Sequence, residues 1–293
     1  METFDFISKI PIDKGWSEDK KYHVTKKDGS EFLLRISPSP LFEARKSLFE
    51  LLQKIVDLGI PMSKPVEFGI CSEGVYSLHT WIHGKDAEEI IPFLSEADQY
   101  KLGYESGEIL RKIHSIPAPS MEEEWDIRFN RKTNNKIQKY NECGLRFVGD
   151  DKIIEYIEKN RDLLKNRPQC FQHGDYHIGN MMIEDGKIVI IDFDRPDFGD
   201  PWEEFNRIVW CAQSSPHFAT GQLNGYFGGK PPIEFFKLLA FYISSNTLSS
   251  IYWAIPFGQV QIDTMMRQSQ DVLAWYDNMQ HPVPAWYLEE LNS

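Results

Sequence analysis

The chain has 293 residues, enough for one large domain or two modest ones with a substantial buried core. It carries 32 Lys and Arg residues against 44 Asp and Glu residues, a formal net charge of −12 at pH 7. A chain this negative repels phosphate backbones, so we do not expect a broad nucleic-acid-binding surface, whereas cationic small molecules are attracted. The share of hydrophobic residues, 41%, with 26% charged residues, excludes a disordered chain.

The four cysteines stand far apart in the sequence and include no CxxC pair, so neither a zinc site nor a disulfide framework is predicted. The first ten residues begin with acidic side chains and lack the basic run and apolar core of a signal peptide. The most apolar segment, residues 235–257, contains Lys237 and several Ser and Asn residues, so we expect a buried helix there and not a membrane span. These features predict a cytoplasmic protein without a membrane partner.

The first part of the chain is predicted to be rich in β-strands. Two strand-like runs flank Asp28-Gly29, a pair that readily adopts the positive φ angles of a tight hairpin turn. A helix follows because Leu and Ile recur at helical spacing, and Gly59 with Pro61 ends it. In chain order, the expected elements are strands at 21–26 and 31–36, a helix over 41–58, and strands at 66–70 and 75–81.

Beyond Gly84 the pattern becomes mainly helical, and Ser95 is a suitable N-cap for the first long helix. An Asp-Gly pair at 185–186 marks one β-hairpin within this part. The expected elements are helices at 96–113, 128–139 and 151–164, strands at 180–183 and 187–191, and helices beyond 201. We therefore predict an α+β fold with an N-terminal lobe at 1–80, a hinge at 81–84, and a larger, mainly helical lobe at 85–293 that contains the hairpin.

The segment that carries chemistry is His-Gly-Asp-Tyr-His-Ile-Gly-Asn at 173–180, followed by Ile-Ile-Asp-Phe-Asp at 190–194. Asp175 and Asn180 are separated by a short loop, and the hairpin returns the chain so that Asp192 lies beside them. One carboxylate to orient a hydroxyl, with an Asn/Asp pair to hold a divalent metal, is the arrangement that phosphoryl transfer needs. The alternative interpretation is a surface turn that happens to be rich in His, Gly, Asp and Asn.

These two motifs, together with Gly-Asp-Pro-Trp-Glu-Glu-Phe at 199–205, resemble the aminoglycoside phosphotransferase family, the small-molecule relatives of protein kinases. The resemblance implies a bilobal protein-kinase-like fold that uses ATP or GTP with Mg²⁺. It implies that Asp175 orients the acceptor hydroxyl or accepts its proton. It also implies that Asn180 and Asp192 hold magnesium, that His173 braces the loop, and that Asp200 supports the site from behind.

The match is weaker in the N-terminal lobe, where protein kinases hold the α- and β-phosphates with a strand Lys paired to a helix Glu. Here the strand cation is Arg35, and Glu50 on the following helix is the expected partner, with Glu43 as its competitor. An ordinary salt-bridged surface Arg is the alternative for Arg35. No GxGxxG is present, and Gly15 with Ser17 forms the candidate phosphate-covering loop, although an ordinary turn explains them equally well.

Adenine and acceptor sites are assigned by position. Thr80 and Ile82 fall where family members offer hinge backbone groups to the adenine. His177 is open between a phosphate or substrate contact and a scaffold role. Acceptor candidates are the acidic residues Asp197, Glu203 and Glu204, which would pair with ammonium groups, and the aromatic residues Trp210, Tyr252 and Trp253. The alternatives are solvated charges at a helix start and aromatic side chains of the core.

The sequence therefore predicts a magnesium-requiring O-phosphotransferase that uses ATP or GTP on a small, hydroxylated, cationic acceptor. An aminoglycoside antibiotic is the specific expectation, and antibiotic resistance would follow from it. A metabolic kinase for choline, a sugar or homoserine is the nearest alternative. A kinase-like protein that binds nucleotide without transferring phosphate is the third, motivated by Arg35 in place of Lys and by the missing glycine-rich motif. The oligomeric state is left open.

Overall fold

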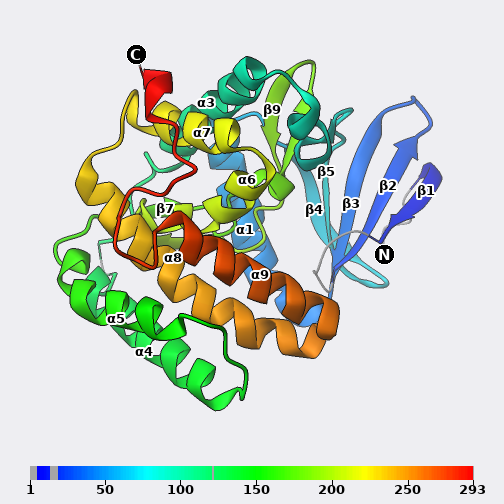
Figure 1. Cartoon of the computed structure of the whole chain (residues 1–293). Helices are drawn as coiled ribbons and strands as arrows, with labels where there is room; N and C mark the ends of the chain where they lie inside the picture. Colours follow the sequence, from blue (N-terminus) through cyan, green and yellow to red (C-terminus); the bar gives the residue numbers. More distant parts are fainter. Residues whose placement is uncertain (1–4, 14–18, 121, 293) are drawn as a thin grey trace. The chain divides into compact units, whose positions relative to one another are not determined.

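The computed structural model describes residues 5–13, 19–120 and 122–292. Backbone contacts divide the chain into two compact units, one made of residues 1–86 and 181–191 and the other of residues 87–180 and 192–293. Figure 1 shows strands concentrated in the first unit and helices in the second, as the α+β prediction requires. The predicted boundaries at 1–80, 81–84 and 85–293 stay a prediction.

The first unit is built on a five-stranded antiparallel sheet in the order β1-β2-β3-β5-β4. The Asp-Gly turn joins β2 to β3 as predicted. Gly29 has a φ of +84°, and the Asp28 carboxylate accepts hydrogen bonds from the backbone N–H and the hydroxyl of Ser30. The strands are β1 (Phe6–Ile12), β2 (Lys20–Lys26), β3 (Glu31–Ser37), β4 (Pro65–Cys71) and β5 (Gly74–Thr80).

A single helix, α1 (Phe42–Asp57), packs against this sheet and matches the helix predicted at 41–58. Its buried side chains Phe49, Leu52 and Ile55 repeat every three residues and so lie on one face. Phe49 meets Phe68 of β4 with ring centroids 5.5 Å apart. The apolar side of the sheet itself is covered by a compact cluster whose buried members are Val24, Leu34, Ile36, Tyr76 and Leu78.

The predicted hairpin is present as β8 (Met181–Glu184) and β9 (Lys187–Ile190). We expected it within the helical part, whereas backbone contacts group it with the first unit. The reason is pairing on both of its sides. β8 pairs with β6 (Lys85–Asp86), and the Ile190 N–H donates to the carbonyl of Pro61 at 2.8 Å.

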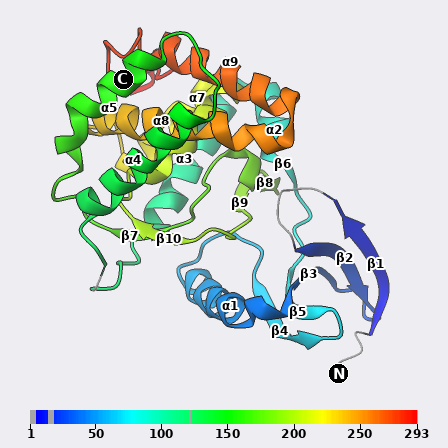
Figure 2. The ribbon, with the colours of Figure 1, turned by 90° about the horizontal axis from the view of Figure 1, so that it is seen from below.

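The second unit is a helical assembly around the long, largely buried helix α8, beside which α4, α5 and α9 lie (Figure 2). The apolar segment predicted to be a buried helix is this α8. Nowhere in the described ranges is a helix both long and apolar enough to span a bilayer. The longer helices are α3 (Glu96–Ile113), α4 (Trp125–Glu142), α5 (Asp150–Asn160), α6 (Ile208–Ser214), α7 (Pro216–Phe227), α8 (Ile233–Ala254) and α9 (Gln259–Trp275).

Helices α3 and α7 approach each other at backbone distance because glycines face the opposite helix from both sides. A Cβ added at Gly107 would lie 2.1 Å from the carbonyl oxygen of Gln222, and one added at Gly225 would lie 2.0 Å from that of Tyr104. Such a contact tolerates no side chain at these positions. The close pair supports the loop at 173–180, because the Tyr176 hydroxyl donates to the carbonyl of Ser106 on α3.

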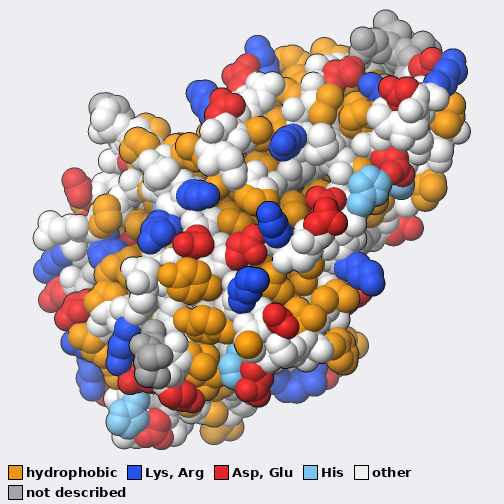
Figure 3. Space-filling view, turned by 90° about the horizontal axis from the view of Figure 1, so that it is seen from above, with side chains coloured by type: hydrophobic (Ala, Val, Ile, Leu, Met, Phe, Trp, Pro, Cys, Tyr) orange, Lys and Arg blue, Asp and Glu red, His pale blue; other side chains and the backbone are white. Residues whose placement is uncertain are grey.

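Two short strands and a 3₁₀ helix complete the second unit near the sequence motifs. β7 (Cys170–Gln172) pairs antiparallel with β10 (Asp197–Gly199), and η5 (Glu203–Arg207) follows. On the face seen in Figure 3, positive and negative side chains are interspersed with apolar ones, without a continuous patch of either sign.

Candidate active site

The loop predicted to be catalytic leaves β7 and passes directly over the backbone of Arg195. Gly174 has a φ of +87°, and a Cβ added to it would lie 1.8 Å from the Arg195 carbonyl oxygen. Both the positive φ and the lack of space require glycine at this position. Only glycine at this position of the motif allows the loop and the segment after β9 to approach each other so closely.

Asp175, the predicted catalytic residue, lies between an arginine and a histidine. Arg207 Nε is 3.2 Å from Asp175 Oδ1, and His177 Nε2 is 3.7 Å from the same oxygen. Burial by itself would raise the pKa of Asp175, but the hydrogen bond with His177 and the charge of Arg207 outweigh it and hold the pKa well below its ordinary value. The carboxylate is thus ionised at neutral pH. It is suited to accept a hydrogen bond from a hydroxyl and orient it.

Hydrogen bonds within the same loop hold Asn180 through its nitrogen atoms, and they do not use its side-chain oxygen. Its Nδ2 donates to the backbone carbonyl of Asp175 at 2.8 Å, and its backbone N–H donates to the carbonyl of His177. Within the described part of the chain no hydrogen bond uses Asn180 Oδ1. An amide oxygen held in this way is a ligand of the type that Mg²⁺ accepts.

Asp192 is brought to the same end of the β8–β9 hairpin as Asn180. The register pairs Met181 with Ile190, so the residues immediately outside the hairpin, Asn180 and Ile191, adjoin each other and Asp192 follows. Asp192 has a φ of +67°, a left-handed conformation that is costly for a residue with a side chain and is often found at functional sites.

The side-chain oxygens of Asn180 and Asp192 are ligands of the type that Mg²⁺ prefers, and the ring nitrogen of His177 lies 3.4 Å from Asn180 Nδ2. Among the described residues no group of three or more His, Cys, Asp or Glu side chains could enclose a metal. Mg²⁺ commonly binds through one or two protein oxygens, with water and substrate phosphates completing its shell. The residues present therefore fit the ion that the resemblance implies.

His173 and Glu204 hold the loop from beneath. His173 is fully buried, its Nδ1 accepts from the Asp175 N–H at 3.3 Å, and its ring packs 4.4 Å from that of Phe193. Glu204 accepts from the Gly174 N–H at 3.0 Å and lies 3.8 Å from His114 Nε2. Although burial raises its pKa, the contacts with His114 and His173 outweigh this and lower the pKa of Glu204 below its ordinary value.

Asp200, which we predict to support the site, lies behind this layer. It is fully buried and receives Arg167 in a two-pronged pair at 2.7 and 2.9 Å, the Tyr242 hydroxyl at 2.6 Å, and the Trp202 N–H at 2.9 Å. Its carbonyl accepts from Gln172, the residue before His173. Asp200 therefore ties the start of the loop to helix α8.

The three acidic acceptor candidates are all engaged inside the protein. Asp197 pairs with Arg128 at 2.6 Å, and Glu203 lies 3.8 Å from Lys132 and accepts from Gln172. Glu204 is only 2% exposed, and its carboxylate is committed to the loop as described above. Each of the three carboxylates therefore has a partner within the protein.

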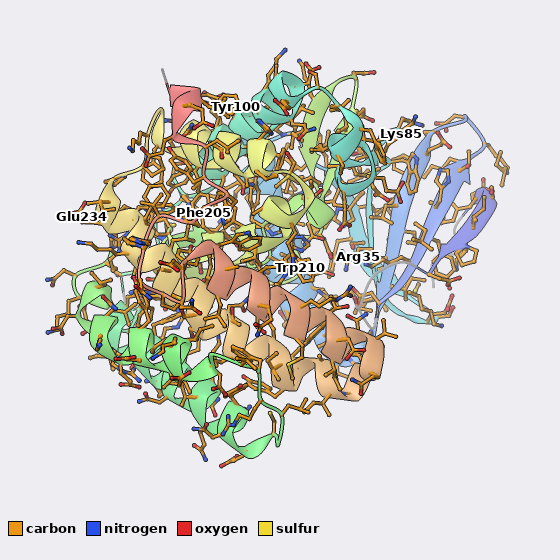
Figure 4. The ribbon with its side chains drawn as sticks, viewed as in Figure 1. Arg35, Lys85, Tyr100, Phe205, Trp210 and Glu234 are labelled. Atoms are coloured by element: carbon orange, nitrogen blue, oxygen red, sulfur yellow. The ribbon has the colours of Figure 1, made fainter. Side chains whose placement is uncertain are left out.

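The aromatic candidates lie at different depths. Trp210, labelled in Figure 4, stands on α6, and its ring is 6.4 Å from that of His177. Trp253 and Phe257, whose rings are 4.7 Å apart, are 37% and 42% exposed at the end of α8 and just beyond it. Tyr252 lies 6.0 Å beneath Lys139 Nζ.

Arg207 and two lysines of α4, Lys132 and Lys136, were not singled out from the sequence. The sequence predicts an exposed helix for the basic run at 128–139. The tertiary structure brings Lys132 within 3.8 Å of Glu203 in η5 and Lys136 within electrostatic reach of Arg207. The sequence signal that could have identified the two lysines is their spacing. They are four residues apart and therefore share one helix face.

In the first unit Arg35 has a different partner from the expected one. Its Nη2 lies 3.1 Å from Oδ2 of the buried Asp19, which also pairs with Arg45. Glu50 is exposed and lies 4.0 Å from Lys46, one helical turn away. Glu43 is also exposed, in the first turn of α1. The structure therefore brings Arg35 together with Asp19.

The two expected hinge positions differ in what their backbones can offer. The Thr80 N–H donates to the Lys64 carbonyl at 2.9 Å, and its own carbonyl accepts from the Ser63 hydroxyl at 2.6 Å. The backbone of Ile82, by contrast, enters no hydrogen bond with the described residues. Ile82 is therefore the better placed of the two to bind an adenine edge. Gly15 and Ser17 lie outside the described residues.

The model of the phosphotransferase enzyme family known as APH matches residues 9–236, which is more than half of the chain and includes both motifs. The chain belongs to this phosphotransferase family. This membership confirms the resemblance noted in the sequence. The residues of the site are therefore interpreted in terms of phosphoryl transfer. The comparison with curated proteins finds no match.

Solved structures resemble the chain over most of its length. A thermostable mutant of aminoglycoside phosphotransferase APH(4)-Ia in the apo form is 12% identical, with a TM-score of 0.66, covering 92% of this chain and 94% of that one. A choline/ethanolamine kinase family protein from Mesorhizobium loti is 15% identical, with a TM-score of 0.68 and coverage of 94% and 92%. APH(2'')-IIa in a gentamicin complex is 17% identical, with a TM-score of 0.60 and coverage of 90% and 91%. These likenesses confirm the predicted α+β, kinase-like fold.

Proposed function

We propose that this phosphotransferase moves the terminal phosphoryl group of ATP or GTP to a hydroxyl group of a small molecule. The observation that carries the proposal is the loop at 173–180. There an ionised Asp175 and the side-chain oxygen of Asn180 are fixed by hydrogen bonds within one short segment. Phosphoryl transfer needs mainly positioning and charge neutralisation, which such a loop provides.

In the proposed reaction Asp175 accepts a hydrogen bond from the acceptor hydroxyl and aims its oxygen at the terminal phosphorus. As the new O–P bond forms, the bond from that phosphorus to the bridging oxygen breaks and the nucleoside diphosphate leaves. The hydroxyl proton passes to Asp175 late, because a carboxylate with a depressed pKa is a weak base in the ground state. Asn180 and Asp192 would hold Mg²⁺, which neutralises phosphate charge when bound.

For the nucleotide we propose Arg35 as the phosphate-binding cation and the Ile82 backbone as the adenine contact, with Thr80, Gly15, Ser17 and Glu50 as further candidates. Arg can bind phosphate oxygens with two parallel hydrogen bonds, so the replacement of Lys does not preclude the role. Solved neighbours support a nucleotide co-substrate: forms of APH(4)-Ia were crystallised with ADP or AMP-PNP and hygromycin B. A cytoplasmic location remains part of the proposal.

The acceptor classes to test follow from the neighbours and from the sequence. Aminoglycosides come first because structurally similar proteins bind hygromycin B and gentamicin, and resistance to such antibiotics would be the consequence. Choline and ethanolamine follow from the Mesorhizobium loti neighbour. Sugars and homoserine complete the panel.

The test is a coupled assay of nucleoside diphosphate release across this panel, with wild type and Asp175→Asn. Asn has nearly the same shape as Asp but cannot accept the proton, so we expect turnover to fall by about 10²–10⁴-fold. Undiminished turnover in the variant would remove the assigned role of Asp175. Tight binding of Mg-nucleotide by calorimetry, with no turnover of any acceptor, would favour the non-catalytic alternative.

A further inference from the structure

The charges that surround Asp175 within the helical unit are mainly positive. Arg207 contacts its carboxylate, and Arg195 acts on it electrostatically. Lys136 of α4 is within electrostatic reach of both Lys132 and Arg207. Four cations from three segments of the chain, α4, η5 and the residues after β9, are therefore linked to Asp175 or to one another by a contact or by their charges.

Three acidic side chains of the same region already have partners within the protein. Asp197 is engaged by Arg128, and the Glu204 carboxylate accepts hydrogen bonds from the loop backbone. Glu203 is shared between Lys132 and Gln172. An ammonium group entering the site would find no free carboxylate among these three and would face the repulsion of the cations.

Lys136 is a cation of this group that has no close anionic partner among the described residues. It is half-buried, and within the described ranges its Nζ makes no hydrogen bond or ion pair, with only the Phe129 ring nearby at 5.9 Å. Desolvation, followed by the charges of Lys132 and Arg207, lowers the pKa of Lys136 to about 7, although Glu203 acts in the opposite direction. A partly desolvated ammonium is costly unless an anion pairs with it.

We propose that the acceptor of this phosphotransferase carries an anionic group, a carboxylate or a phosphate, near the hydroxyl that is phosphorylated, and that Lys136 binds this group with Lys132 and Arg207 beside it. The inference rests on the proposed function and narrows its acceptor to hydroxy acids and sugar phosphates. It replaces the expectation of a cationic acceptor. The net charge of −12 is no obstacle, because a local group of cations determines the field at short range.

The first experiment compares acceptors that differ only in the anion: glycerol with glycerate, and glucose with glucose 1-phosphate, with kanamycin as the cationic member. We expect turnover with an anionic member and not with its neutral counterpart. In Lys136→Met the KM for that acceptor should rise about 10–100-fold, a change of the size expected for one charged contact, with the KM for ATP unchanged. The control is Lys139→Met, an exposed lysine on the same helix, which should match wild type.

The second experiment needs no turnover. Lysine side chains are acetylated at pH 7 and quantified by mass spectrometry, with and without 10 mM glycerate, glucose 1-phosphate or Mg-AMP-PNP. We expect Lys136 to react faster than Lys139 and to be protected severalfold by the acceptor anions. Protection by Mg-AMP-PNP alone would mean that Lys136 serves the nucleotide, which would overturn the inference.

The two proposals fail in different ways. Turnover of kanamycin, choline or a neutral sugar that is unaffected by Lys136→Met would overturn the anionic acceptor and leave phosphoryl transfer intact. Protection of Lys136 by glycerate or glucose 1-phosphate without turnover of any acceptor would support the anion site and count against the proposed function.

Discussion

Two arginine–carboxylate pairs of the second unit have almost the same geometry and very different surroundings, which makes their comparison a sharp test. Arg167 meets Asp200 through two hydrogen bonds of 2.7 and 2.9 Å, and Arg131 meets Glu123 through two of 2.6 and 2.7 Å. The Asp200 side chain is fully buried, whereas the Arg131 side chain is 66% exposed. Burial is therefore the variable that differs.

The substitution Arg167→Met leaves Asp200 buried without its counter-charge. Tyr242 and the Trp202 N–H continue to donate to it, but two charge-assisted hydrogen bonds and the stacking of the guanidinium 3.7 Å from the Trp202 ring centre are lost. Removing one partner of a buried pair costs about 3–5 kcal/mol. Arg131→Met removes an exposed pair, whose loss costs about 0.2–1 kcal/mol.

Urea unfolding followed by circular dichroism measures both variants, because urea, unlike guanidinium chloride, does not screen charge. With a slope of about 3 kcal/mol per M, the midpoint should fall by about 1–2 M for Arg167→Met and by less than about 0.4 M for Arg131→Met. Arg167→Lys, which keeps the charge without the fork, should lie between wild type and Arg167→Met. Equal losses for the two methionine variants would refute the reasoning, since they would mean that water compensates Asp200 as readily as Glu123.

Two further predictions concern packing and pH. Gly107→Ala should lower the free energy of unfolding by about 1–3 kcal/mol, because its methyl group would overlap the Gln222 carbonyl and force α3 and α7 apart. Glu108→Ala on the outer face of α3 is the control, and a Gly107→Ala melting temperature equal to that of wild type would contradict the prediction. The pKa of Lys136 is lowered to about 7 in the folded protein, against an ordinary value of 10.5. Between pH 7 and pH 10.5 the unfolded chain therefore binds a proton that the folded chain does not. The free energy of unfolding consequently rises with pH in this range. The urea midpoint of wild type minus that of Lys136→Met should therefore increase from pH 7 to pH 10, and a difference independent of pH would count against the depressed pKa.

The features that followed from the sequence are those in which cause and effect lie close together in the chain. Asp-Gly pairs specify the turns of both hairpins because the positive φ that each turn needs is local, at Gly29 in the first hairpin and at Asp185 and Gly186 in the second. The five-residue interval from Asp175 to Asn180 places the amide against the Asp175 carbonyl through one short loop. The register of a single hairpin then brings Asp192 to the same end.

The features that the sequence left undetermined are contacts between distant segments. Arg35 was assigned a partner on α1 by analogy, but the fold of the sheet brings Asp19 to it instead. Glu204 lies in a run of acidic residues that the sequence cannot distinguish from a solvated helix start. Burial against the loop N–H groups makes it a brace for the loop.

By itself the sequence thus determined the order of elements, and it predicts the phosphotransferase loop and the oxygen ligands for a metal, because turn chemistry and short spacings act locally. Only the tertiary structure decided which charges neutralise one another. Arg207 meets Asp175 across 32 positions of sequence, and Lys132 meets Glu203 across 71. Pairings at such separations depend on how helices pack, and no local periodicity encodes them. The sign of the charge around Asp175 is consequently a property of the packed helices.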